Sequence, residues 1–297
     1  MVSNELVEVT DQLFLLPGNN DGRFPYSHSI LILDEEIVLI DTGCGIEILK
    51  ELKKRFEISH VINSHTHPDH SAGNWVFQGR PICVPEEGFD SSGDIVALSK
   101  RFANEELAET WQHFVKKALG FQDCQPTGTY TEGQPLTFGE TSLKVIHTPG
   151  HTVDHYCFYE KEQGVLLSFD YDLTSFPWYG HRESSLSEFR ASIKRLKALS
   201  PRIVVSSHRG IIAENIDAEF DRFSKIIDER NVKLLKLLEE GKTIEGIVDM
   251  APIYGKFPYA ETLLRYWETQ MIRQHLEELE KDGKVHQQGD YFIRNKK

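Results

Sequence analysis

The segment His65-Thr66-His67-Pro68-Asp69-His70 constrains the fold of this chain most, because it places three imidazoles and a carboxylate within six residues. It begins three residues after the apolar pair Val61-Ile62, which predicts a strand. In an extended chain the side chains at 65 and 67 fall on the same side, and Pro68 disfavours helical geometry at His67, so these two imidazoles stay together. Asp69 and His70 would then point to a second place. Imidazole nitrogen and carboxylate oxygen suit zinc, with iron or manganese as alternatives, so the segment predicts two adjacent divalent metal ions.

Three further candidate ligands each stand just after an apolar stretch that predicts a strand. His151 comes after residues 143–146, Asp170 after residues 165–169, and His208 after residues 203–206. Functional side chains gather at the strand ends of sheets that are covered by helices, since the loops there leave the backbone and meet at one edge. We therefore expect these three side chains to join the first cluster.

This ordered set resembles the metallo-β-lactamase-fold hydrolases, whose HxHxDH motif stands here as His65, His67, Asp69 and His70. The resemblance covers about residues 5–215 and implies an α/β fold, a four-layer αββα sandwich with the metals at one edge of two facing sheets. It implies that His65, His67 and His151 hold one metal ion and that Asp69, His70 and His208 hold the second. Asp170 would bridge both. Seven groups then give each ion four ligands and leave an open position on each.

The resemblance also covers Asp41, in Asp41-Thr42-Gly43. We expect this carboxylate to lie behind a ligand imidazole and orient it, rather than to bind metal. A simple turn aspartate is the alternative interpretation.

Two divalent ions, with zinc favoured, imply hydrolysis by a metal-bridging hydroxide, with catalytic roles for Asp69 and Asp170. The substrate would be a small ester, thioester or lactone, and Asp69 could pass a proton to the leaving group. A metal-dependent nuclease or phosphodiesterase is the alternative, and a non-catalytic metal sensor or scaffold is a second one. Phe169 stands where many relatives have glycine, and Leu173 stands where lactonases of this fold usually have tyrosine, which weighs against a lactone substrate.

Specificity is expected to reside in the loop after Asp170, which is rich in aromatic residues. Its candidate substrate residues are Tyr171, Asp172, Phe176, Trp178, Tyr179, His181 and Arg182. Aromatic rings would suit an apolar acyl chain or ring, and Arg182 would suit a carboxylate or phosphate. The alternative is that these aromatic residues cover a contact with the C-terminal region. His147 and His155 are interpreted as supporting residues, not ligands.

Apolar spacing divides the chain into two predicted domains. Residues 1–212 would form the metal-binding domain, with a helical insertion at about 90–120. Residues 213–297 predict three helices, over 216–238, 243–250 and 261–281, and a hairpin over 284–293. That order resembles a winged helix, and the long helix from Asn215 would serve packing or homodimer formation.

Charge limits the partners of this chain. The formal net charge is −13 and the four cysteines are far apart. These features weigh against nucleic acid, a disulfide framework and a thiolate metal site. No apolar run reaches the ~18 residues that span a bilayer, so we expect a cytoplasmic protein with a small-molecule substrate and no membrane contact.

Overall fold

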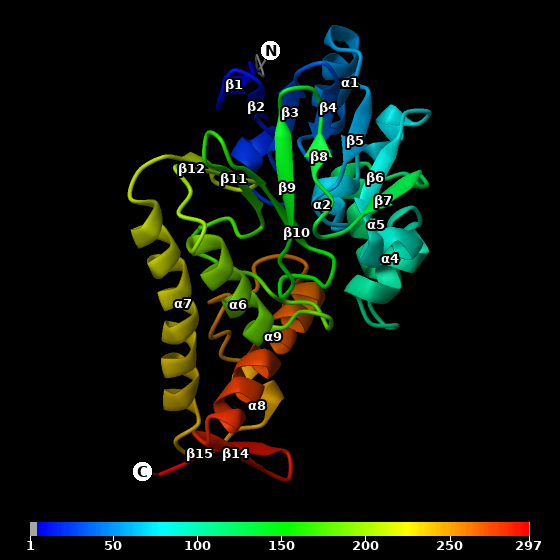
Figure 1. The fold of residues 1–297 in the computed structure, drawn as a ribbon. Coiled ribbons are helices and arrows are strands. Elements are labelled where there is room, and N and C mark those ends of the chain that lie inside the picture. Colours follow the sequence, from blue (N-terminus) through cyan, green and yellow to red (C-terminus); the bar gives the residue numbers. More distant parts are fainter. Residues whose placement is uncertain (1–4, 297) are drawn as a thin grey trace.

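The computed structural model describes residues 5–296 and contains two large β-sheets (Figure 1). The first sheet has seven strands in chain order, antiparallel from β1 to β4 and parallel from β4 to β7. The strands are β1 (Val7–Glu8), β2 (Leu13–Leu16), β3 (Ser29–Leu33), β4 (Ile37–Ile40), β5 (His60–Ile62), β6 (Ile82–Pro85) and β7 (Gly128–Tyr130).

The second sheet has six strands in the order β13-β12-β11-β10-β9-β8. Its one parallel pairing joins β11 to β12, and the other neighbours are antiparallel. The strands are β8 (Leu136–Thr137), β9 (Ser142–His147), β10 (Tyr156–Glu160), β11 (Val165–Phe169), β12 (Ile203–Ser206) and β13 (Gly210–Ile212).

Alternation along the strands decides which side chains lie between the two sheets. Ile30, Ile32 and Val38 of the first sheet share one buried cluster with Val145 and Leu167 of the second. Leu31 and Leu39, one residue out of phase, face the other way and pack on helix α1 (Ile46–Arg55). The first sheet is therefore covered by the second sheet on one face and by helix on the other.

The outer face of the second sheet is covered by α6 (Leu186–Lys197) and α7 (Ile216–Leu237). The Ser185 side chain caps α6 by accepting a hydrogen bond from the Glu188 backbone amide. These layers complete the four-layer αββα sandwich, so the expected α/β fold class is confirmed.

The predicted helical insertion lies between β6 and β7. It contains α3 (Phe89–Ser92), α4 (Ile95–Phe102) and α5 (Ala108–Leu119). Shorter helical turns lie at η1 (Asn19–Gly22), α2 (Pro68–Ser71), η2 (Asn74–Phe77) and η3 (Glu86–Gly88).

The C-terminal region contains α8 (Ile244–Val248), α9 (Glu261–Lys281) and a hairpin of β14 (Val285–Gln288) and β15 (Tyr291–Arg294). Helix α7 belongs to two clusters, since Phe220 and Phe223 pack on the second sheet and Leu234 and Leu238, at and just beyond its C-terminal end, pack with α8 and α9. The division at residues 212/213 therefore stays a prediction.

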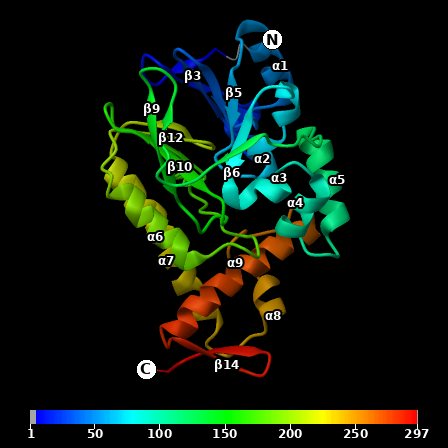
Figure 2. The same cartoon turned by 45° about the vertical axis from the view of Figure 1, so that its right-hand side comes forward.

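Helix α9 reaches back from the hairpin towards the insertion (Figure 2). Its first turns place Leu263, Leu264 and Trp267 in one buried cluster with Trp111 and Val115 of α5. Segments about 150 residues apart in sequence thus meet in one buried cluster. Among residues 5–296, none of the helices has the length and apolar character needed to cross a membrane.

Candidate metal centre

The histidine-rich segment begins three residues after β5 and continues into the short helix α2. Pro68 is the first residue of α2, a position that needs no backbone N–H, and it turns the chain after His67. All six residues of the segment are buried. Burying imidazoles and a carboxylate is unfavourable, because these groups lose their hydration, unless they bind one another or a cation.

One group of ligand atoms joins the start of the segment to two distant residues, and it consists of His65, His67, His151 and Asp170. His67 Nδ1 lies 3.0 Å from His65 Nε2 and 2.9 Å from His151 Nε2. His151 Nε2 lies 3.1 Å from Asp170 Oδ2. Ligands on a tetrahedral zinc ion are about 3.3 Å apart at the usual bond lengths, so these separations fit one ion with little adjustment.

A second group consists of Asp69, His70 and His208. Asp69 Oδ2 lies 3.9 Å from His70 Nε2 and 3.7 Å from His208 Nε2. The other carboxylate oxygen of Asp170 approaches this group, with Oδ1 2.9 Å from His70 Nε2 and 3.4 Å from His208 Nε2. Asp170 thus presents one oxygen to each group.

The remaining ring nitrogens of four of these histidines have acceptors behind them. His70 Nδ1 donates to Asp41 at 2.7 Å, His151 Nδ1 to the Trp178 carbonyl at 2.9 Å, and His208 Nδ1 to the Gly22 carbonyl at 2.7 Å. His65 Nδ1 lies 3.0 Å from the Ser64 hydroxyl. With these nitrogens donating outwards, the second nitrogen of each ring points towards the carboxylates. A ring nitrogen and a carboxylate oxygen attract each other only with a cation between them, a proton or a metal ion, so the residues fit divalent metal ions.

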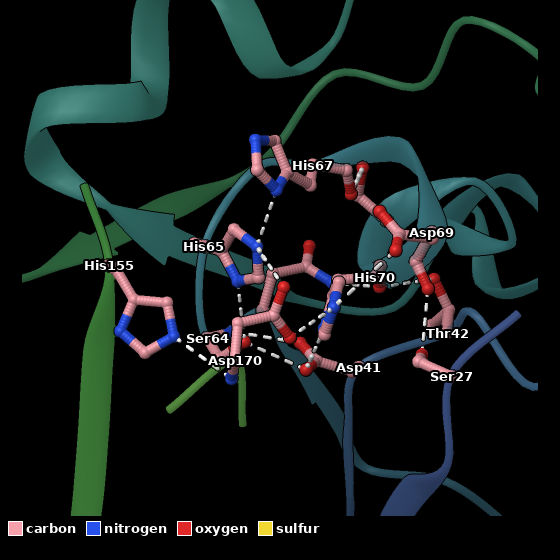
Figure 3. Close-up of polar contacts among 12 residues, drawn as sticks. Ser27, Asp41, Thr42, Ser64, His65, His67, Asp69, His70, His155 and Asp170 are labelled. Carbon is pink, nitrogen blue, oxygen red and sulfur yellow. Dashed lines mark hydrogen bonds and ion pairs between the residues drawn. The ribbon is translucent and has the colours of Figure 1, made fainter. Parts of the chain in front are cut away.

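Asp41 lies behind this centre and is not part of either ligand group (Figure 3). Its carboxylate accepts hydrogen bonds from the Ser64 backbone amide and the Ser64 hydroxyl, both at 2.7 Å, as well as from His70. One buried carboxylate thereby fixes the residue before His65 and the ring of His70.

The electrostatics of the site follow from burial and from Asp170. Burial lowers the pKa of His65 and of His67 well below the ordinary value, so both rings are neutral, as metal ligands must be. Burial opposes the charged form of His70 and His208 too, but Asp170 outweighs it and raises the pKa of His208 to about 9 and that of His70 well above its ordinary value. Without metal ions, protons on these two rings balance the carboxylate, and divalent cations would displace them.

Backbone geometry and one further histidine position Asp170. Phe169, just before it, has φ 49°, in the left-handed region that favours glycine, so the backbone here takes a conformation that glycine adopts more easily. The Phe169 ring is buried between the sheets, which stabilises this conformation. The Asp170 amide donates to His155 Nε2 at 3.3 Å. His155 therefore supports Asp170 and is outside both ligand groups.

A partly buried ionic network next to the histidine segment was not expected from sequence. Arg101 of α4 lies 3.0 Å from Asp154 and also pairs with Glu183, and the Thr66 amide donates to Asp154 at 3.2 Å. Burial raises the pKa of Asp154, but Arg101 outweighs it and lowers the pKa to about 2. The network ties the residue between His65 and His67 to the insertion. Its members are too far apart in sequence to form a motif.

A cavity of about 430 Å³ opens beside both ligand groups. Of the expected substrate residues, Asp172, Phe176, Trp178 and His181 line it, and burial raises the pKa of Asp172 to about 6. Candidate ligands, Pro68 and Thr174 also line the cavity. Ten further lining residues come from distant segments, which sequence reasoning missed: Arg23, Phe24, Trp111, Phe114, Val115, Leu119, Tyr254, Tyr259, Leu264 and Trp267.

None of Tyr171, Tyr179 and Arg182 lines the cavity, so their contact with substrate stays a prediction. Both tyrosines are fully buried and pack on Phe189 of α6, with ring centroids 4.7 and 5.2 Å away. Their hydroxyls bind the Pro149 carbonyl and His275. Both rings therefore lie in the core against α6, and the Tyr179 hydroxyl alone of the two reaches the C-terminal region, at His275 of α9.

The geometry agrees with comparisons to known proteins. A family model described as the metallo-beta-lactamase superfamily matches residues 22–208, which contain all seven candidate ligands. The acyl-coenzyme A thioesterase MBLAC2 of Homo sapiens is 24% identical over 209 residues, 64% of this chain and 71% of that protein. The atrochrysone carboxyl ACP thioesterase of Aspergillus terreus is 23% identical over 257 residues, 82% of this chain and 68% of that protein.

Two solved structures share the fold over nearly the whole chain. A metallo-beta-lactamase family protein from Thermus thermophilus superposes with a TM-score of 0.76 at 24% identity, covering 97% of this chain and 100% of that one. A beta-lactamase domain protein from Burkholderia ambifaria gives a TM-score of 0.74 at 16% identity, covering 99% and 94%. At these identities the likeness concerns the fold, and its coverage includes the C-terminal helices.

Proposed function

This chain belongs to the metallo-beta-lactamase superfamily and is a hydrolase, and from that premise we propose that it is a two-metal thioesterase. The observation that carries the proposal is the position of Asp170, which presents Oδ2 to one histidine group and Oδ1 to the other. A carboxylate shared in this way is what two adjacent ions need to remain close together.

Each proposed ion has its own ligands. His65, His67 and His151 would hold one, Asp69, His70 and His208 the other, and Asp170 would contact both. Zinc is the proposed metal because its preferred ligands include imidazole and carboxylate. Bound there, the ions would supply a water activated at neutral pH and would polarise the substrate carbonyl.

The chain's own residues would align the substrate and move the proton. Hydrolysis forms a carbon–oxygen bond, breaks the carbon–sulfur bond and transfers one proton from water to the departing thiol. Asp69 is placed to carry that proton, because its carboxylate belongs to the second ligand group and lines the cavity. Burial raises the pKa of this carboxylate, which favours its role in proton transfer. The Ser27 hydroxyl donates to the Asp69 carbonyl at 2.7 Å and fixes its backbone (Figure 3).

A thioester is preferred to the other acyl substrates for two reasons. Relatives that align with most of this chain are named as an acyl-coenzyme A thioesterase and an acyl carrier protein thioesterase. The cavity beside Asp170 is lined largely by aromatic and aliphatic side chains, which suit an acyl group better than a phosphodiester. The net charge of −13 also disfavours a polyanionic nucleic acid.

The test is a substrate panel combined with metal analysis. Acetyl and octanoyl thioesters, a lactone, an oxygen ester, a β-lactam and a phosphodiester would be assayed with the wild type, His67→Ala and Asp170→Ala. The matched control is His286→Ala, an exposed histidine of the hairpin. We expect about two metal equivalents and fastest turnover of thioesters, both lost in the two site variants. Preferred cleavage of the phosphodiester, or less than one tightly bound metal ion, would contradict the proposal.

A further inference from the structure

Besides the candidate ligands, the cavity has walls of apolar side chains from two helices. Trp111 and Val115 of α5 form one wall, and Leu264 and Trp267 of α9 form a second. These residues are mostly buried in one common cluster, so the walls are packed parts of the fold. The candidate ligands do not account for this apolar part of the lining.

Phe24 and Trp178 join the two walls. Phe24 stacks on Phe114 with ring centroids 6.1 Å apart and meets Trp267 edge-on at 6.5 Å. Trp178 contacts Trp267 at 5.8 Å, and its indole N–H donates to the Tyr254 hydroxyl at 2.8 Å. Aromatic rings from four distant segments therefore enclose the space beside the metal centre.

We propose that this cavity is an acyl-binding pocket, built jointly by α5 and by the C-terminal region, that selects thioesters with a long alkyl or ring-containing, uncharged acyl group. The inference rests on the proposed thioester hydrolysis. With the scissile carbonyl at the metal centre beside Asp170, the acyl group can contact these apolar walls, where each aromatic contact replaces water.

The thiol half of the substrate is the less suitable occupant. Coenzyme A and the acyl carrier prosthetic group both carry phosphate, which loses strong hydration in an apolar pocket. Arg23 is the one arginine or lysine among the lining residues, and its side chain is exposed, next to Phe24. The phosphate-bearing thiol half of the substrate would therefore stay at the solvent-exposed side of the cavity.

Chain length provides the first measurement. Burial of one methylene stabilises by about 0.8 kcal/mol, which corresponds to a rise in kcat/KM of about fourfold. We expect that rise for each added methylene from acetyl upward, until the acyl chain fills the cavity. Coenzyme A thioesters and N-acetylcysteamine thioesters should show the same slope, because the preference comes from the acyl half.

Two variants test the walls. Phe24 is 48% exposed, so Phe24→Ala should fold normally and reduce kcat/KM for decanoyl thioesters by about tenfold while acetyl thioesters change less than twofold. Leu264→Phe fills the pocket from the other wall and should shift the optimum to shorter chains. Tyr291→Ala, which removes a 54% exposed ring of the hairpin, is the matched control and should leave the profile unchanged.

A binding measurement separates this inference from the proposed function. Three of the four tryptophans (Trp111, Trp178 and Trp267) line the cavity, so intrinsic fluorescence reports occupancy without turnover. We expect 1-decanol to change the emission at lower concentration than 1-butanol, and Phe24→Ala to weaken the response at least threefold. Such binding without hydrolysis of any thioester would overturn the proposed function and support the pocket. Thioester hydrolysis with equal kcat/KM for acetyl and decanoyl would overturn the pocket and leave the function.

Discussion

The backbone carbonyl of Trp178 lies 2.9 Å from Nδ1 of His151 and accepts its hydrogen bond. The indole of the same Trp178 lines the cavity and binds Tyr254 of the C-terminal region. One residue thus orients a candidate metal ligand through its backbone and forms the cavity wall through its side chain. These two roles can be separated by mutation.

Trp178→Phe should alter the cavity and spare the metal centre. The carbonyl that holds His151 remains, so we expect unchanged metal content by elemental analysis. Loss of the indole N–H and of ring area should lower kcat/KM for long-chain thioesters about tenfold. A fall in metal content would show that the side chain, not the backbone, positions His151.

Asp41→Asn should weaken metal binding although Asp41 is outside both ligand groups. The carboxylate accepts from His70 and twice from Ser64, and an amide cannot replace all three bonds. We expect a tenfold to hundredfold loss of metal affinity, which corresponds to a loss of about one to three kcal/mol of binding free energy. Competition with a chromophoric chelator measures it, with Asp217→Asn, an exposed aspartate of α7, as control. Equal affinities in the two variants would rule out a supporting role for Asp41.

Asp154→Asn should change how stability depends on pH. In the folded protein Asp154 has a pKa of about 2, against an ordinary value of 3.8. A lowered pKa means that its contribution is fully present above about pH 4 and disappears as pH falls through about 2, and it amounts to about 2 kcal/mol at neutral pH. Urea unfolding should therefore show a less stable variant at pH 7 and a smaller difference near pH 3. A constant difference at both pH values would contradict this reasoning.

Removal of metal should lower thermal stability. Ions that bind the folded chain at 100 times their dissociation constant stabilise it by about 2.7 kcal/mol each. For a chain of this size we expect chelation to lower Tm by roughly 5–15 °C, measured by scanning calorimetry. Asp170→Ala should respond little to chelator. A wild-type Tm that is indifferent to chelation would argue against tightly held ions.

Local patterns allowed much of the fold to be predicted. The apolar spacing of the insertion, of α7 and of α9 predicted helices where the structure has them, because amphipathic periodicity is set by nearby residues. Short edge elements such as β1 and β8, with two residues each, were not predicted, because pairing with a neighbouring strand defines them.

The site, like the fold, has a part that local sequence predicts and a part that it does not. The six residues from His65 to His70 predict a metal centre, and His151, Asp170 and His208 each follow a strand that the sequence predicts. The network of Arg101, Asp154 and Glu183 has no such mark, because its pairs are separated by 53 and 82 residues.

The sequence by itself determined the seven candidate ligands, because local spacing and strand ends mark them, and its resemblance to the metallo-β-lactamase-fold hydrolases implied the layered fold. Only the tertiary structure decided what surrounds them. It turned Tyr171 and Tyr179 into the core, and it brought Phe24, Trp111 and Trp267 around one cavity. That outcome depends on how α9 packs against α5, a contact between segments about 150 residues apart. Neither the entropy cost of closing so long a loop nor the fit of the two helices is encoded in a local sequence pattern.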